Sequence, residues 1–226
     1  MSLPTRRRSP SVILVGILAL FSLAATDPAR EAPPPPSPKF ERPANALFAD
    51  DFSSDSLKGW RADSLASAWS VRDSALRGDL PDTKQSHSFL YAGDSTWTDY
   101  ALDFDVCGMR GVDKGAAVRV HRRKGLGVDL RAGDHNDVLA YVNRFPVGSG
   151  KVQNENGAWH HMRIEIRGSS FRILVDGTLV EDKHLKIKTP PRSGGIVLAA
   201  YAGGVGECTV YYDNVVVTPL TGKSEE

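Results

Sequence analysis

The sequence predicts an all-β protein in which two antiparallel sheets pack face to face over residues 45–220. Apolar and polar side chains alternate with a period of two in many short runs, such as 100–107 and 160–167, and this period is typical of strands with one buried face. Turn-forming residues separate the runs, as at Gly168-Ser169-Ser170. No long amphipathic helical pattern interrupts them, which favours a β-sandwich over a mixed fold.

Residues 1–26 are expected to direct export. Arg6–Arg8 form a basic start, and Val12–Ala25 is a run of apolar and small residues. The run contains a small-x-small cleavage pattern at 22–24, so the segment is either a removed signal peptide or a retained membrane anchor. In both cases the arginines stay on the cytoplasmic side. We therefore expect an extracytoplasmic domain, periplasmic or secreted, that is membrane-anchored if the segment is retained.

Residues 27–44 predict a Pro-rich linker, and residues 221–226 a short polar tail. Four consecutive prolines, Pro33–Pro36, favour an extended polyproline conformation, and the segment has too few apolar residues to form a core. It would hold the domain away from a membrane or act as a plain disordered tether.

The predicted strands follow the alternation in chain order. The first opens at Leu47 and Phe48. The later runs are 100–107, 118–121, 126–131, 138–143, 160–167, 171–175, 196–201 and 208–217. Asp176-Gly177 predicts a tight hairpin after 171–175, because such turns need positive backbone angles. About a dozen short strands are expected in total.

Composition narrows the function classes. Hydrophobic residues make up 41% and charged residues 24% of the 226 residues, which is ordinary for a globular protein. The net charge of +1 offers no electrostatic case for nucleic-acid binding. Cys107 and Cys208 are the only cysteines, too few for a cysteine-based zinc site. They could pair in an oxidising compartment, which would stabilise the fold by roughly 3–5 kcal/mol, or stay free.

The stretch GAWHHMRIEIRGSSFRILVDGTLV, residues 157–180, resembles the concanavalin A-like lectin/glucanase superfamily in its laminin-G-like branches. Residues 46–60 resemble its opening strand and 194–220 its closing pair. The middle strands are similar, more narrowly, to the 3-keto-disaccharide hydrolase domain. The resemblance implies a jelly-roll sandwich over 46–220. It also implies a structural role for Trp159 and for the hairpin, and the strand period predicts that His160 is packed and that His161 faces solvent.

A polar sheet face is the predicted ligand site. If the middle strands are neighbours, their outward positions gather one set of side chains on one face: Asp103, Asp105, Arg119, His121, Asp129, Arg131, Tyr141 and Asn143. Members of the resembled superfamily bind sugars on such a face. Arg and Asp can hydrogen-bond sugar hydroxyls, and the Tyr141 ring can stack on a sugar. The alternative is a solvated face with interleaved ion pairs.

An enzymatic reading has less support in the residues. Glycosidases need paired carboxylates, and the glucanase pattern Glu-x-Asp-x-x-Glu is absent. In the keto-disaccharide hydrolase reading, Asp103, Asp105 or Asp129 would be the acid–base group and His121 an assistant. Asp129 and Arg131 stand where that family has Glu and Gln, which leaves the catalytic assignment open.

A calcium site is a further prediction. Asp50, Asp51 and Asp213 lie near the two ends of the domain, which pair in the resembled fold, and carboxylates suit calcium. The alternative is that these residues only stabilise turns.

Three functions follow from these observations. The favoured one is a non-catalytic, membrane-tethered scaffold module that is an accessory subunit of a larger membrane protein complex, such as an electron-transport or photosynthetic assembly. The second is a carbohydrate-binding module whose partner is a glycan. The third is a sugar hydrolase or lyase of the keto-disaccharide type.

Overall fold

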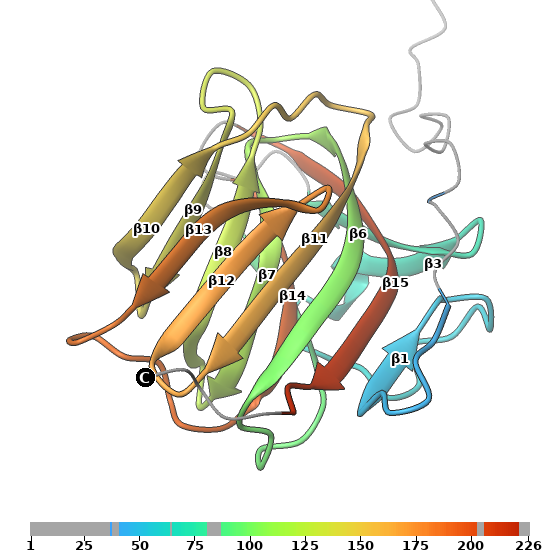
Figure 1. The fold of residues 1–226 in the computed structure, drawn as a ribbon. Coiled ribbons are helices and arrows are strands. Elements are labelled where there is room, and N and C mark those ends of the chain that lie inside the picture. The colour runs from blue at the N-terminus through green and yellow to red at the C-terminus, as the bar shows by residue number, and fades with distance from the viewer. Residues whose placement is uncertain (1–36, 38–40, 64, 81–86, 203–205, 222–226) are drawn as a thin grey trace, which may run out of the picture. The chain divides into compact units, whose positions relative to one another are not determined.

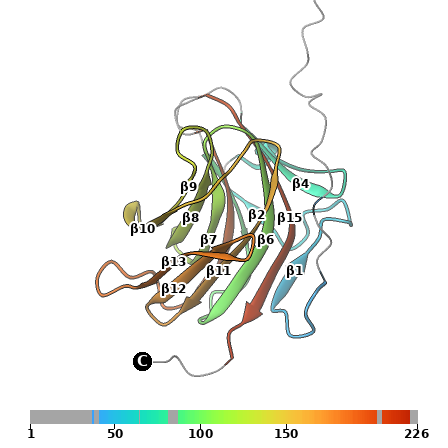
Figure 2. The same ribbon diagram turned by 45° about the horizontal axis from the view of Figure 1, so that its top comes forward.

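The computed structural model describes residues 37, 41–63, 65–80, 87–202 and 206–221, which form two antiparallel sheets packed as a jelly-roll sandwich. Figures 1 and 2 show the two layers, with β11 and β12 of one sheet lying over β7 and β8 of the other. The prediction of an all-β sandwich is confirmed. The predicted leader, residues 1–26, lies outside the described residues. No helix within the described ranges is long and apolar enough to cross a membrane.

We call the first layer sheet A. Its strands run in the order β13 (Thr178–His184), β12 (Ser170–Val175), β11 (Trp159–Arg167), β6 (Tyr100–Arg110), β15 (Cys208–Pro219), β4 (Ala75–Leu80) and β3 (Trp69–Arg72). The first strand, β1 (Phe48–Asp50), pairs with β15, so the two ends of the domain meet as predicted. A 3-10 turn at Ala66–Ala68 precedes β3.

The second layer is sheet B. Its order is β10 (Phe145–Lys151), β9 (Asp137–Val142), β8 (Lys124–Arg131), β7 (Asp113–His121), β14 (Gly195–Tyr201), β5 (His87–Ala92) and β2 (Arg61–Ala62). Consecutive strands β7 to β10 are joined by hairpins and form one half of the sheet. Strands β14 and β5, distant in sequence, form the other half.

The core lies between the sheets because alternate residues of each strand point inward. Phe104 and Met162 of sheet A and Leu126 and Leu198 of sheet B are fully buried in one hydrophobic cluster. Tyr212 is also buried there, and its hydroxyl bonds to backbone groups of Gly115 and Ala199 on sheet B, which ties the two layers together.

Within the described ranges, four two-residue hairpin turns have both residues in the left-handed region. The predicted Asp176-Gly177 turn is one of them, with φ of 50° and 76°. The others are Asp73-Ser74, Arg122-Arg123 and Asn143-Arg144. Turns of this primed type match the twist of a hairpin and favour Asn, Asp and Gly. Arginine occupies three of these positions, although it is unfavourable for this backbone conformation. The usual residue preferences of turns therefore do not predict these turns from the sequence.

Of the two alternatives for Cys107 and Cys208, the structure shows the unpaired one. Both thiols are free. In the ladder between β6 and β15, Cys107 is opposite Tyr211. Tyr211 lies three residues after Cys208, and because side chains alternate along a strand, Tyr211 and Cys208 point to opposite faces. Cys208 therefore faces the core between the sheets, while Cys107 packs on the outer face of sheet A beside Trp159.

Candidate functional site

A groove of about 910 Å³ crosses the outer face of sheet B. Its floor consists of small residues on three adjacent strands: Gly125 and Gly127 of β8, Ala117 of β7 and Ala199 of β14. Large side chains flank the floor on both sides. Because the side chains are small in the middle of the sheet and large at its sides, the surface is hollowed there.

Aromatic side chains of β5 form one wall. His87, Phe89 and Tyr91 alternate on the outward positions of this strand, with ring centroids 4.9 Å apart for the first pair and 6.4 Å for the second. Tyr201 of β14 continues this wall, 6.4 Å from His87. The alternation His-Ser-Phe-Leu-Tyr-Ala over 87–92 was the available signal for this wall, which the predicted site did not include.

Leu139, Tyr141 and Pro146, from β9 and β10, form the opposite wall. The Tyr141 ring lies over Gly127. A Cβ atom at that glycine would stand 2.3 Å from Cζ of the tyrosine. Gly127 is therefore required for the position of the ring, since no larger residue leaves room for it.

Asp129 is the single carboxylate among the described residues that line the groove. It is partly exposed, and its Oδ1 accepts a hydrogen bond from the Tyr141 hydroxyl at 3.3 Å. Burial, with the neighbouring Asp113 carboxylate, raises the pKa of Asp129 to about 8. Burial, and then the Asp129 carboxylate, raise the pKa of Tyr141. At neutral pH Asp129 is therefore largely protonated and can donate as well as accept a hydrogen bond.

The predicted site residues fall into different places. Asp129, Tyr141 and Asn143 line the groove together. Arg131 lies farther along β8 and makes a bidentate ion pair with Asp137, at 2.8 and 2.7 Å. His121 is exposed in a neighbouring pocket of about 330 Å³.

Arg119 lies outside the groove, contrary to the prediction. It sits in a bulge of β7 with φ of 49°. Its guanidinium donates to the carbonyl oxygens of Thr98 and Gly168 and pairs with Asp99 at 2.6 Å. The bulge shifts the alternation by one position, so that this buried side chain holds two loops rather than a ligand.

Asp103 and Asp105 lie on the other sheet, because β6 is in sheet A while β7, β8 and β9 are in sheet B. The prediction that these strands are neighbours is therefore wrong for β6. The two carboxylates are almost fully buried on the outer face of sheet A. Strand alternation places them outward but does not reveal which sheet they belong to.

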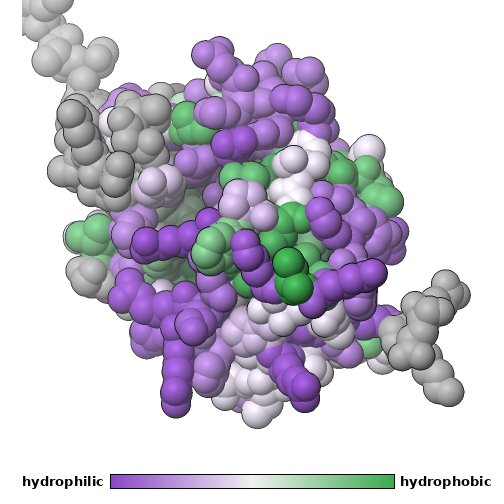
Figure 3. All heavy atoms as spheres, turned by 90° about the vertical axis from the view of Figure 1, so that its left-hand side faces the viewer, coloured by the Kyte–Doolittle hydropathy of each residue, from purple (hydrophilic) through white to green (hydrophobic). Residues whose placement is uncertain are grey.

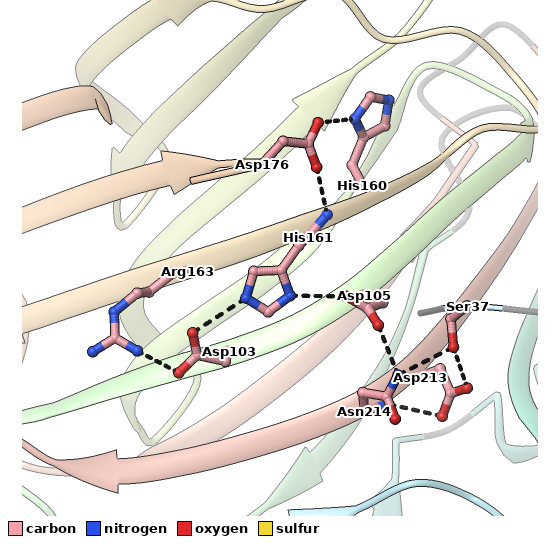
Figure 4. Close-up of polar contacts among 9 residues, drawn as sticks. All are labelled: Ser37, Asp103, Asp105, His160, His161, Arg163, Asp176, Asp213 and Asn214. Atoms are coloured by element: carbon pink, nitrogen blue, oxygen red, sulfur yellow. Dashed lines mark hydrogen bonds and ion pairs between the residues drawn. The ribbon is translucent and has the colours of Figure 1, made fainter. Parts of the chain in front are cut away.

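A polar network surrounds these two carboxylates (Figure 4). His161 contacts both, with Nδ1 2.8 Å from Asp105 and Nε2 3.4 Å from Asp103. Arg163 pairs with Asp103 at 2.6 Å, and Asn214 donates to Asp105 at 2.7 Å. Hydrogen bonds to Asp103 and then Asp105 raise the pKa of His161 to about 9. The prediction that His161 simply faces solvent missed these contacts.

The neighbouring His160 is mostly buried, as predicted. Its Nδ1 lies 2.8 Å from Asp176 in the hairpin turn, and its Nε2 is a buried nitrogen for which the structure provides no partner. Figure 4 shows this pair beside the network of His161. The Trp-His stretch thus belongs to the framework of sheet A.

The predicted calcium ligands do not form a metal-binding group. Asp50 accepts hydrogen bonds from Trp60 and Phe52, and Asp51 from Ser53. Asp213 accepts from Ser37, a residue of the predicted linker, at 2.5 Å. Across the described ranges, no group of three or more His, Cys, Asp or Glu side chains could hold a metal ion. Asp50 and Asp51 instead stabilise turns, and Asp213 binds Ser37 of the predicted linker.

Comparison with known proteins identifies the family. Residues 45–218 match the 3-keto-alpha-glucoside-1,2-lyase-like domain. The chain belongs to this family. The match begins and ends within two residues of the predicted sandwich. No curated protein sequence matches the chain.

Solved structures similar to this family member share its fold at low identity. The carbohydrate-binding module CBM66 from Bacillus subtilis has a TM-score of 0.58 and 19% identity, covering 71% of this chain and 95% of its own. A Bacillus licheniformis beta-glucanase has a TM-score of 0.60 and 14% identity, covering 79% and 100%. A prokaryotic beta-1,3-1,4-glucanase from a mouse hindgut metagenome has a TM-score of 0.59 and 14% identity, covering 76% and 99%.

Proposed function

We propose that the domain binds a saccharide in the groove of sheet B. The observation that carries the proposal is the groove itself, where the aromatic wall of β5 and Tyr201 faces the wall that holds Tyr141 across a floor of small residues. Sugar rings present apolar C–H faces that stack on aromatic rings, and hydroxyls that need a few well-placed polar partners. Asp129 and Tyr141 supply such partners between the walls.

Similar structures support this reading. One is a carbohydrate-binding module, and others are glucanases. The groove holds one carboxylate among its described residues, whereas hydrolysis by the common glycosidase mechanism needs two. This difference favours binding over glycosidase activity.

The test is a screen of soluble oligosaccharides by calorimetry, followed by substitutions in each wall. Tyr141→Ala and Phe89→Ala are expected to weaken binding at least about tenfold each, which corresponds to a loss of about 1.4 kcal/mol. Arg172→Ala, on the exposed outer face of sheet A, is the control and should leave the affinity unchanged. Binding that survives both wall substitutions would rule out the groove.

Lyase chemistry is a second candidate, because a specific residue favours it. Eliminating the C1 substituent of a 3-keto sugar requires a base that takes the C2 proton, which is acidic because it lies beside the C3 keto group. It also requires an acid that protonates the departing C1 oxygen. Asp129 holds its proton near neutral pH and faces the groove, which suits the acid role. Family membership supports the same chemistry.

Turnover of a 3-keto-glucoside decides this candidate. If Asp129 is the acid, Asp129→Asn should lower kcat at least about 100-fold while the substrate still binds, since general acid catalysis contributes 10²–10⁴-fold. Binding without turnover by the unmodified protein would leave the saccharide-binding proposal and remove the catalytic one.

The membrane-complex partner and the extracytoplasmic location remain proposals that rest on residues 1–44. The structure describes only Ser37 and 41–44 of that segment.

A further inference from the structure

We infer that the groove of sheet B is built for an acidic saccharide, whose anionic group is bound by a basic cluster at one end of the sheet. The cluster consists of Arg61, Arg122, Arg123, Lys124 and Arg144. This inference rests on the proposed saccharide groove and specifies the chemical class of its ligand.

The topology brings these residues together. The β7–β8 turn carries Arg122 and Arg123, and the β9–β10 turn carries Arg144. Leu126 of β8 pairs with Val142 of β9, so the two turns lie side by side at the same end of the sheet. Arg61 of β2 reaches this end from the other side, through its pairing with Tyr91.

The cluster extends the groove rather than lying apart from it. Arg123, Lys124 and Arg144 line the end of the groove. Arg61 and Arg122, with His121, line the adjoining pocket of about 330 Å³, and Tyr91 and Val120 belong to both. A pocket of this size is at the lower end of the range that binds small ligands.

Tyr91 lies at the junction of groove and cluster. The Arg61 guanidinium lies 4.6 Å from the centroid of its ring. Burial raises the pKa of Tyr91, while Arg123 and Arg61 beside it act to lower that pKa. The last aromatic ring of the wall is therefore flanked by two guanidinium groups, which suits a sugar ring that carries an anion.

These five cations are exposed, and among the described residues their charge is not paired with carboxylates. In the described part of the chain, no ion pair joins any of the five to a carboxylate. At least one ion pair is made by each of Arg77, Arg119, Arg131, Arg163 and Arg172. Asp63, whose carboxylate acts to raise the pKa of Tyr91, accepts hydrogen bonds from Ser88 and from the backbone N–H of Phe89. An incoming carboxylate or sulfate would therefore meet uncompensated charge.

Backbone strain supplies a second argument. Arg122, Arg123 and Arg144 have φ of 47°, 65° and 73°, in turns where Asn and Gly fold more easily. The protein thus keeps three arginines at a cost in stability, all at one end of the groove. Strain of this kind is concentrated at functional sites.

The shape of the surface favours a saccharide over other anions. The charge leads into an aromatic groove rather than onto a flat face, and the net charge of the whole chain is only +1. Nucleic acid and anionic membranes would be attracted by charge spread over a larger surface.

The test compares matched ligands on the full-length chain. Calorimetry measures the affinity for uronate and sulfated oligosaccharides and for their methyl-esterified and desulfated forms, which separates the two kinds of anion. We expect at least one acidic ligand to bind at least tenfold more tightly than its neutral counterpart, with an affinity that falls between 50 and 300 mM salt.

The double variant Arg122→Asn with Arg123→Gly separates binding from folding. It introduces the preferred residues of this turn, so its Tm should rise by roughly 2–4 °C, while the preference for the acidic ligand is lost. Ser74→Gly in the matching turn of sheet A should also raise Tm and should leave binding unchanged.

Each outcome is decisive. Equal affinity for acidic and neutral ligands, with binding that still depends on Tyr141 and Phe89, would overturn the acidic preference and keep the proposed function. Competition by DNA or by anionic lipid vesicles that survives Tyr141→Ala would also overturn it, in favour of nonspecific charge binding. A chain that binds no saccharide at all would overturn both.

Discussion

At His161 the strand period correctly predicts which way the side chain points, but it does not predict which residues surround it. It points outward from β11, as the alternation predicts, yet it lies against Asp103 and Asp105 of the neighbouring strand β6. Two carboxylates that are nearly buried need compensation, because an unpaired buried charge is costly. His161 and Arg163 provide it, so these aspartates stabilise sheet A and do not act in the groove.

Asp129 makes a testable contribution to the pH dependence of stability. Its pKa is about 8 in the folded protein and 3.8 as a free side chain, so the folded state binds the extra proton between these values. Stability from this group is therefore lost as the pH rises from about 4 to about 8. Relative to the unmodified protein, Asp129→Asn should gain at least about 1–2 kcal/mol between pH 5 and pH 8, measured by chemical denaturation.

His161 provides the comparison for this measurement. Its pKa is raised from 6.5 to about 9, so its stabilisation is complete below pH 6.5 and disappears as the pH rises through 9. Asp129→Asn should leave this second decline in place. If the variant and the unmodified protein have parallel stability curves from pH 5 to pH 8, the raised pKa of Asp129 is refuted.

Strand β8 illustrates how one element shapes the groove. Its outward positions hold Gly125, Gly127 and Asp129, while its inward positions hold Leu126, Val128 and Leu130. Glycine inside a strand weakens it, and often marks close approach of another group. Here that group is the Tyr141 ring.

Gly127→Ala tests this arrangement. The added Cβ would overlap the tyrosine ring, so the ring must leave its place over β8 and lose its hydrogen bond to Asp129. We expect a loss of about 1–3 kcal/mol in the free energy of unfolding, as for other overpacked sites. Binding of saccharide should weaken as much as in Tyr141→Ala.

A double-mutant cycle provides the control for this prediction. In the Tyr141→Ala background the methyl group meets no ring, so Gly127→Ala should then cost much less. Additive costs of the two changes would mean that the glycine matters for the strand backbone and not for the tyrosine.

The position of the two cysteines on opposite faces of sheet A makes a prediction for the whole molecule. A disulfide closing a loop of about 100 residues would stabilise the protein by about 5 kcal/mol. Because both thiols are free and buried, reducing agents should leave the Tm of the full-length chain unchanged. A fall of roughly 10 °C or more on reduction would contradict the structure.

Much of the fold could be predicted, because strand alternation and turn chemistry are local. The runs at 160–167 and 171–175 and the turn at Asp176-Gly177 appear as expected. Part of the candidate site was also found in this way, since Asp129 and Tyr141 lie on strands joined along the chain and Asn143 lies in the turn after the second. The aromatic residues of β5 were missed because β5 joins the groove only through β14, more than a hundred residues later.

Local sequence patterns thus establish the sandwich, its strands and the direction of most side chains, since these depend on residues a few positions apart. The assignment of β6 to one sheet and β7–β9 to the other depends on long-range pairing, which no local period encodes. That pairing removes Asp103 and Asp105 from the predicted face and brings the aromatic wall of β5 into it. It also gathers arginines from separate turns at one end of sheet B, where they lie next to the groove.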